Sequence, residues 1–138
     1  MTKKTVSLAA ITLLAAVVVW LLIALPTDRQ LVATDSTHEN IQYLTVDAPE
    51  LKEGRQLRFA AYDADCGMVQ LCFSLKKGDR VFWQGEDIAI TVNGTAVEKW
   101  EHLTHSTWKR DYFSILLAGV APGAQIIFTY NGQTITIQ

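Results

Sequence analysis

Hydrophobic residues follow two different patterns along the chain. From Val6 to Leu25, twenty successive residues carry no charge, which is the length that an α-helix needs to cross the hydrocarbon core of a bilayer. Beyond residue 40, apolar and polar positions alternate with a period of two, and turn residues interrupt the alternation, as in half-buried β-strands. The two patterns predict one membrane helix followed by an all-β domain.

The alternating region divides into eight or nine short strands, with no helical stretch between them. Two of its turns are the Asn-Gly pairs Asn93-Gly94 and Asn131-Gly132, which favour type I′ hairpins because both central residues take positive φ. The predicted strands cover residues 41–46, 56–62, 69–75, 80–83, 88–92, 95–100, 112–118, 125–130 and 133–137. Strands joined by hairpin turns, without crossover helices, predict an antiparallel β-sandwich.

The alternation also assigns side chains to the two faces of each strand. One face of the second strand is predicted to carry Leu57, Phe59 and Ala61. One face of the third is predicted to carry Val69, Leu71, Phe73 and Leu75. Cys72 then points to the opposite face of the third strand, beside Gln70 and Ser74.

The charges around the apolar run orient it in the membrane. Lys3 and Lys4 precede it and acidic residues follow it from Asp28 onward, so the N-terminus stays in the cytoplasm and the rest is exported. A cleaved signal peptide is the alternative, although its apolar region is usually shorter and ends at a small-x-small site. We predict a cytoplasmic N-terminus at 1–5, a transmembrane signal anchor at 6–25, a stalk at 26–40 and an exported domain at 41–138. The domain would lie outside the cytoplasmic (inner) membrane, in the periplasm of a Gram-negative cell.

Export changes the interpretation of the cysteines. Cys66 and Cys72 are the two cysteines of the chain, and an oxidising compartment favours a structural disulfide between them. Such a bond would close across the outer face of the hairpin 56–75 and fix its register. A redox pair is disfavoured, because redox pairs of the thioredoxin kind use C-x-x-C spacing.

The end of the chain resembles a known class of sandwich. The stretch LLAGVAPGAQIIFTYNGQTITI, residues 116–137, combines a Pro-Gly turn with an alternating strand pair. It resembles the late-strand corner of immunoglobulin-like and fibronectin-like sandwiches. Ile126 stands near the place where a corner tyrosine is sought, and the two cysteines are too close in sequence for the bridge between the sheets of antibody domains. The resemblance implies a fold class and no activity.

Composition excludes some classes of partner. The chain has a formal net charge of −2, and two of its lysines precede the anchor, so the exported part is more acidic still. An acidic module is a poor ligand for nucleic acid, and this one lacks the polybasic run that binds anionic headgroups. We therefore expect no nucleic acid among its partners, and no cofactor.

The segment 100–110, WEHLTHSTWKR, is the most unusual stretch of the domain, and we predict it as a loop. It holds two of the four tryptophans and two of the three histidines. Loops on a rigid sandwich are common binding sites, and Trp, Tyr and Arg carry much of the binding energy of protein interfaces. The predicted partner-binding residues are Trp100, His102, His105, Trp108, Lys109, Arg110 and Tyr112. The alternative is that Trp100 and Trp108 fold inward and close the end of the sandwich.

Other candidate chemistry is weaker. His102 and His105 form an H-x-x-H pair, but residues three apart share a face on a helix and not on a strand. A triad of Ser106, a histidine and Asp111 would depend on one loop, without independent elements to hold it rigid. The sequence contains no nucleophile elbow, zinc-protease motif or glycine-rich phosphate loop. We predict no metal site and no enzymatic activity.

Together these features favour a protein-protein interaction module. The first hypothesis is an anchored, exported sandwich that serves as the accessory subunit of an envelope complex or as an inhibitor or immunity-type protein. The alternative is a domain that binds a small ligand, either a glycan or a metal. A second alternative is a structural, self-associating component of the envelope.

Overall fold

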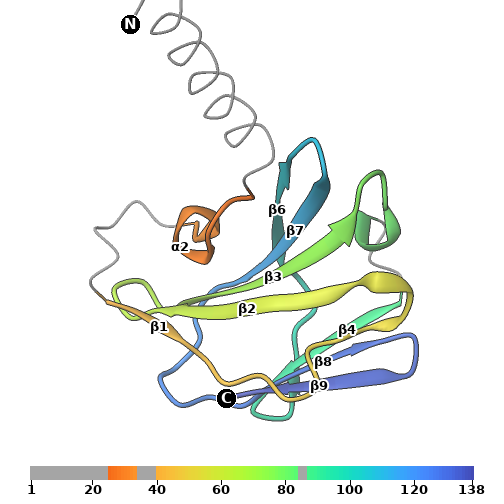
Figure 1. Cartoon of the computed structure of the whole chain (residues 1–138). Coiled ribbons are helices and arrows are strands. Elements are labelled where there is room, and N and C mark those ends of the chain that lie inside the picture. Colours follow the sequence, from red (N-terminus) through yellow and green to blue (C-terminus); the bar gives the residue numbers. More distant parts are fainter. Residues whose placement is uncertain (1–24, 34–39, 84–86) are drawn as a thin grey trace, which may run out of the picture.

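The computed structural model describes residues 25–33, 40–83 and 87–138, which form two antiparallel β-sheets (Figure 1). The alternation of the sequence predicted this architecture. The predicted anchor lies outside the described residues, apart from Leu25 at its end. Within the described part of the chain, no helix is long and apolar enough to cross a membrane.

The strands fall into a larger and a smaller sheet. The larger sheet contains, in spatial order, β1 (Ile41–Tyr43), β2 (Gln56–Asp63), β3 (Met68–Lys76), β7 (Arg110–Leu117) and β6 (Glu101–Ser106). The smaller sheet contains β5 (Thr95–Ala96), β4 (Ile88–Val92), β8 (Ile126–Tyr130) and β9 (Gln133–Ile137). The short helices are α2 (Asp28–Leu31), η1 (Lys52–Gly54) and η2 (Val81–Trp83).

Both predicted Asn-Gly hairpins are confirmed. Asn93 and Gly94 have φ values of 49° and 81°, and Asn131 and Gly132 have values of 47° and 78°. Positive φ at both central residues is the signature of the type I′ turn. These turns join β4 to β5 and β8 to β9 within the smaller sheet.

The facing sides of the two sheets enclose the main core. Phe73 of β3 packs against Phe128 of β8, with ring centroids 4.8 Å apart, and Phe82 of η2 lies 4.9 Å from Phe73. All three rings are fully buried. Aromatic contacts at these distances stabilise the fold beyond the burial of their area, so they tie the two sheets together.

A β-bulge in β2 reverses part of the predicted pattern of faces. Leu57 pairs with Phe73 but Phe59 pairs with Cys72, so Arg58 is an extra residue in β2. Leu57 therefore faces the main core, whereas Phe59 packs on the outer face of the larger sheet. Leu57, Phe59 and Ala61 were predicted to share one face, and this was wrong, because a bulge shifts the alternation by one position.

The predicted disulfide between Cys66 and Cys72 is not formed. Both cysteines are free: Cys66 is exposed in the turn after β2, and Cys72 is buried in β3. Asp63 pairs with Met68 across this turn, and Cys72 lies four residues beyond Met68, which is about 13 Å along a strand. A disulfide needs Cα atoms within about 7 Å of each other, so the strand geometry keeps the two thiols apart. The predicted orientation of Cys72 away from the main core is confirmed.

Three segments differ in secondary structure from the prediction. The strand predicted over residues 95–100 ends at Ala96. Residues 80–83 were predicted as a strand, but Val81–Trp83 forms the 3₁₀ helix η2. The segment 100–110 was predicted as a loop, but most of it belongs to β6 and the start of β7. All six residues of β6 are exposed, so no alternation of apolar and polar residues marks it as a strand.

Residues 41–47 pass from one sheet to the other. β1 pairs with β2 in the larger sheet, whereas Val46 pairs with Ile137 at the end of β9. The Thr45 N–H donates to Gln138 O at 2.8 Å, and the Gln138 N–H donates to Thr45 O at 2.9 Å. This segment thus covers the β9 edge of the smaller sheet.

Residues 25–33, here called the strap, pack on the outer face of the larger sheet, away from the smaller sheet (Figure 1). Thr27 and Gln30 form a capping box at the start of α2, in which each side chain accepts a hydrogen bond from the other residue's N–H. The outer face carries a second buried cluster, here called the outer cluster: Phe59, Ala61, Cys72 and Tyr112. Leu31 and Val32 pack against it. Because a single helical turn is unstable alone, this packing maintains α2, and residues 26–33 of the predicted stalk are folded onto the domain.

Candidate functional site

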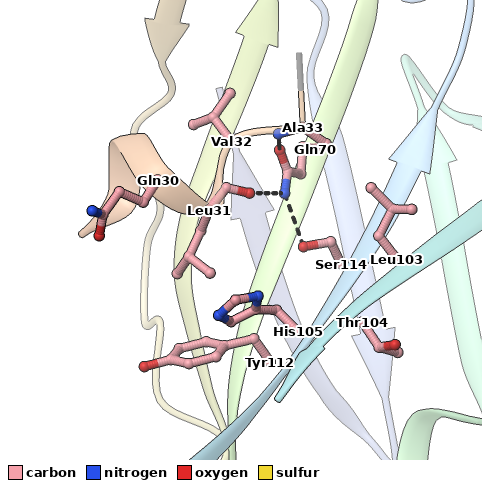
Figure 2. A pocket seen from close by; sticks show the side chains of 10 residues that line it. All are labelled: Gln30, Leu31, Val32, Ala33, Gln70, Leu103, Thr104, His105, Tyr112 and Ser114. Atoms are coloured by element: carbon pink, nitrogen blue, oxygen red, sulfur yellow. Dashed lines mark hydrogen bonds between the residues drawn. The ribbon is translucent and has the colours of Figure 1, made fainter. Parts of the chain in front are cut away.

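A buried glutamine binds the strap to the sheet. Gln70 of β3 is only 2% exposed, and its Oε1 accepts a hydrogen bond from the Ala33 N–H at 2.7 Å. Its Nε2 donates to Leu31 O and to the Ser114 Oγ of β7, both at 2.9 Å. Figure 2 shows this amide between the strap and β7. The Gln70 side chain thus satisfies one donor and one acceptor of the strap, which would cost about 1–3 kcal/mol each if buried without a partner.

The bulge residue Arg58 also binds the strap through hydrogen bonds. Its Nε donates to Asp28 Oδ1 at 2.5 Å, and its Nη2 donates to Pro26 O at 3.0 Å. Its Nη1 donates to the Tyr112 hydroxyl at 3.2 Å. Burial opposes the charge, but the hydrogen bond to Asp28 and its negative charge outweigh this and raise the pKa of Arg58. The bulge that reverses the faces of β2 therefore also directs a guanidinium group to the strap.

Cys72 lies in the outer cluster that the strap covers. Burial raises the pKa of its thiol to about 11, although the Ser114 hydroxyl and the charge of Arg58 act in the opposite direction. Reactive cysteines are exposed and have lowered pKa values. Cys72 is therefore a packing residue in this fold.

Beside the strap, the outer face of the sheet is open. A groove of about 230 Å³ lies between residues 30–33 of the strap and strand β6 (Figure 2). Gln70, Tyr112 and Ser114 of β3 and β7 line it, with Leu103 and His105 on the β6 side. Leu103 is 46% exposed, so β6 presents an apolar side chain at the groove.

The hairpin β6–β7 is held firmly near its tip. Lys77, in the turn after β3, donates to Thr107 O at 2.7 Å and forms an ion pair with Asp111 at 3.2 Å. Asp111 also accepts hydrogen bonds from the Ser106 hydroxyl at 2.6 Å and from the Gly78 N–H at 2.8 Å. These two hydrogen bonds lower the pKa of Asp111. The network joins the tip of the hairpin to the turn after β3.

Two of the predicted partner-binding residues are half-buried or buried, and a third, His102, is exposed but lies against the Phe113 ring on the inner face of its strand. Trp100 is half-buried against the main core, and the His102 ring stacks on Phe113 with centroids 5.2 Å apart. Tyr112 is 2% exposed within the outer cluster. Trp100 thus folds inward, as the alternative interpretation of this segment required.

The other four predicted residues are exposed on the hairpin. His105 lines the groove on the outer face, and Trp108, with 59% of its surface exposed, lies in the turn at the tip. Lys109 and Arg110 are exposed beside it. The structure therefore divides the predicted site into an inner part that closes the sandwich and an outer part that faces solvent.

The strand geometry of β6 separates the residues of the weaker chemical candidates. His102 pairs with Ile115 of the main core, whereas His105 pairs with Tyr112 of the outer cluster. Residues directly opposite each other in a sheet share a face, so the two histidines lie on opposite faces and do not form a metal pair. Ser106 is adjacent to His105 on the strand and therefore faces the other side. Within the described ranges, no group of three potential metal ligands comes together.

β6 differs from the other sheet edges that the structure describes. β1 has three residues and β5 has two, while residues 45–47 cover β9. β6 has six residues, and β7 is its neighbour among the described strands. Edge strands are usually protected by charges, proline, bulges or a covering segment, but β6 contains Glu101 and no other charged residue or proline. It is the longest uncovered edge of the described fold.

Three residues that shape this site were not predicted from the sequence. Gln70 was placed on the outer face of its strand, but its partners lie 37–44 positions away in the sequence. Arg58 acts through a bulge that has no mark in the sequence. Leu103 had a weak signal, as the sole apolar residue between Trp100 and Trp108.

The chain was compared with known proteins. No family model, curated protein or solved structure matches it.

Proposed function

We propose that the chain is a single-pass membrane protein whose exported, immunoglobulin-like sandwich acts by binding another protein through the hairpin β6–β7. Residues 6–25 would anchor it in the cytoplasmic membrane, with the N-terminus in the cytoplasm and the sandwich outside. An accessory subunit of an envelope complex and an inhibitor or immunity-type protein are the two forms of this function. No catalytic role is part of the proposal.

The order of the strands supports the immunoglobulin-like assignment. The order β2-β3-β7-β6 corresponds to the A-B-E-D sheet of an immunoglobulin domain, and β5-β4-β8-β9 corresponds to C′-C-F-G. Antibody domains carry a disulfide between strands B and F. The corresponding strands β3 and β8 here contribute Phe73 and Phe128, whose rings are 4.8 Å apart.

The observation that carries the functional proposal is the exposed edge strand β6 of this hairpin. Leu103 and Trp108, two of the exposed large hydrophobic residues of the described chain, lie on this hairpin. The network of Lys77 and Asp111 links the tip of the hairpin to the turn after β3, and a surface that is ordered before binding loses less entropy when it binds. Aromatic and arginine side chains at such positions are typical anchors of protein interfaces.

Site-specific photocrosslinking tests the proposal. A benzophenone amino acid placed at Trp108 in the full chain, in cells at native expression, should form an adduct with one exported or membrane protein. The matched control is the same probe at Tyr43, which is 53% exposed on β1. The double variant Trp108→Ala, Arg110→Ala should weaken affinity recovery of that protein without changing the melting curve. Equal adducts at positions 108 and 43, or none at 108, would overturn the assignment of the hairpin.

The anchor is tested separately by protease treatment of spheroplasts. Protease added outside should degrade the sandwich, while the chain resists extraction from membranes at alkaline pH. Recovery of a shortened, soluble chain that begins after residue 25 would instead establish a cleaved signal peptide.

A glycan-binding domain is the second candidate function. The groove of about 230 Å³ beside His105, together with the exposed Trp108, favours it, because exposed tryptophans stack on sugar rings. Titration with oligosaccharides should then change the tryptophan fluorescence of the wild-type chain and not that of Trp108→Phe. An unchanged spectrum in the wild type would remove this candidate.

A further inference from the structure

We infer that β6 pairs in antiparallel orientation with β6 of a second copy of this chain, so that two larger sheets join into one continuous sheet. The inference rests on the proposed function, because it takes the hairpin as an interaction surface, and it names the partner of one edge of that hairpin. Four features of the structure support it: the direction of the backbone groups, the charges, the exposed side chains and the position of the strap.

The backbone of β6 is oriented for pairing at its open edge. The Thr107 N–H donates to Arg110 O at 2.9 Å, and hydrogen-bonded pairs alternate along an antiparallel ladder. Thr104, which lies opposite Phe113, is therefore at a non-bonded position. Its N–H and C=O point away from β7, toward the open edge, where a further strand can pair with them.

The charges of the hairpin complement each other in an antiparallel dimer. Pairing centred on Thr104 places Glu101 of each copy opposite Thr107 of the other copy. The chain around the start of each β6 carries Glu98, Lys99 and Glu101, a net charge of −1. Lys109 is exposed just beyond Thr107, so this end lies near the Lys109 end of its partner, whereas Arg110 is directed to Ser74 of its own chain. Two-fold symmetry repeats this contact at both ends, and complementary charges fix register and orientation. Parallel pairing would place like charges together.

The same register covers the apolar surface of β6. Leu103 of one copy lies directly across from His105 of the other on the outer face, at the close spacing of a non-bonded antiparallel pair. Leu103 is 46% exposed in the single chain. Pairing would remove part of this apolar surface from water, and this burial favours association. An edge strand with only polar side chains would not gain this contribution.

The position of the strap agrees with this symmetry. The two-fold axis of an antiparallel β6 pair is perpendicular to the joined sheet, so rotation about it leaves both outer faces on the same side. The strap of each copy packs on that outer face, as Figure 1 shows for one chain. Two chains anchored through residues 6–25 therefore meet the same membrane. The pairing ends at Thr107 and leaves both Trp108 side chains available to a different protein.

Cysteine crosslinking of the full chain in its membrane tests the register. All variants carry Cys66→Ser, which removes the exposed native thiol. Differently tagged chains with Leu103→Cys and His105→Cys are produced together and oxidised with copper phenanthroline. The expected product is a mixed-tag disulfide dimer, formed at least about tenfold more than with either variant alone, because the two Cα atoms would lie within disulfide range. Tyr43→Cys on the β1 edge is the exposed control and should give no dimer.

A proline at the centre of the pair provides an independent measurement. Thr104→Pro removes an N–H that points away from β7, so it costs no hydrogen bond within the chain. The chain in detergent should then change from dimer to monomer by light scattering, while Thr104→Val, which keeps the N–H, should remain dimeric. Both variants should retain a cooperative melting transition.

The outcomes separate this inference from the proposed function. A monomeric wild-type chain, or equal crosslinking at Tyr43→Cys and in the mixed pair, overturns the β6 dimer. If it is overturned while the probe at Trp108 still captures a different protein, the hairpin remains an interaction surface with another partner. If neither experiment yields an adduct, both proposals fail.

Discussion

The outer face of the larger sheet is covered over β2, β3 and the middle of β7, and it is open over β6. The covered half lies under the strap, where Gln70 and Arg58 form hydrogen bonds with backbone groups of the strap. The open half exposes Leu103 and His105 beside a groove. The chain thus has a covering segment of its own and uses it on one half only. The comparison supports the proposal that the open half binds a partner, because the same sheet shows how this fold buries an apolar face elsewhere.

The largest expected effect on stability comes from removing the hydrogen bonds between Gln70 and the strap. Gln70→Ala leaves Leu31 O and the Ala33 N–H without their partner and should lower the free energy of unfolding by about 2–4 kcal/mol. Urea unfolding of the full chain in detergent, followed by tryptophan fluorescence, measures this loss. Gln125→Ala, at an exposed position, is the control and should change little. An equal midpoint for the two variants would show that the strap does not depend on Gln70.

The two cysteines provide a direct measure of whether the strap is closed. Cys66 is exposed and Cys72 is buried with a thiol pKa of about 11. At pH 8 the thiolate fraction alone should make Cys72 roughly 100-fold slower to alkylate than a thiol of unshifted pKa. Desolvation and the nearby Asp63 also raise the pKa of Cys66, so its greater exposure contributes to the difference between the two rates. Mass spectrometry after a timed pulse of iodoacetamide measures both rates. Gln70→Ala should accelerate Cys72 and leave Cys66 unchanged, and rapid labelling of Cys72 in the wild type would contradict a closed strap.

The same thiol predicts an alkaline limit to stability. Below pH 9 the thiol keeps its proton in both folded and unfolded chains, but above that value the unfolded chain ionises first. Because the pKa of Cys72 rises from 9.0 to about 11 in the fold, its contribution to stability is lost as the pH rises across that range. Melting temperatures of the wild type and Cys72→Ala between pH 8 and pH 11 measure it. The variant should lose less stability over this range, and parallel curves would exclude the effect.

A smaller loss of stability is expected when the hydrogen bonds between Arg58 and the strap are removed, because the Arg58 side chain is partly exposed. Arg58→Ala should lower the free energy of unfolding by about 1–2 kcal/mol, since the solvent screens its pair with Asp28. Arg58→Lys keeps the charge but loses the planar fork that reaches both Pro26 O and Tyr112, and should recover only part of this loss. Full recovery with lysine would mean that charge alone holds the strap.

The smallest effect is expected on the open half. Leu103→Ser should change the free energy of unfolding of the monomer by less than about 0.5 kcal/mol, because the side chain is already 46% exposed. Leu31→Ser, the matched change in the strap, should cost about 1–2 kcal/mol through lost burial. Measuring both in the monomeric Thr104→Pro background separates folding from association. Equal costs would erase the difference between the two halves.

The strands whose apolar residues alternate were predictable from the sequence, and the parts that depend on distant contacts were not. Alternation located β3 and the face of Cys72, and the Asn-Gly pairs located two hairpins, because these signals are local. The bulge at Arg58 follows from pairing with β3, which no local pattern expresses. The expected disulfide failed for the same reason: the spacing of Cys66 and Cys72 in sequence does not give their separation along a paired strand.

The position of the candidate site in the sequence was predicted, but its secondary structure was not. The segment 100–110 was identified by its aromatic and charged residues, and Trp108 is exposed there. Its strand was missed because a strand exposed on both faces has no apolar period. The strap was missed because Thr27 and Gln30 indicate only one helical turn, while its docking depends on Gln70, some forty positions later.

The strap also determines how the domain would respond to mechanical load. Traction applied at residue 25 reaches Pro26 and Asp28 first, where the Arg58 guanidinium holds them. It next reaches Leu31 and Ala33 at Gln70, and arrives at β1 only after both contacts have yielded. The load therefore falls on the contacts of two side chains, one after the other. The strap would in this way protect the strand pairing of the sandwich from tension applied at residue 25.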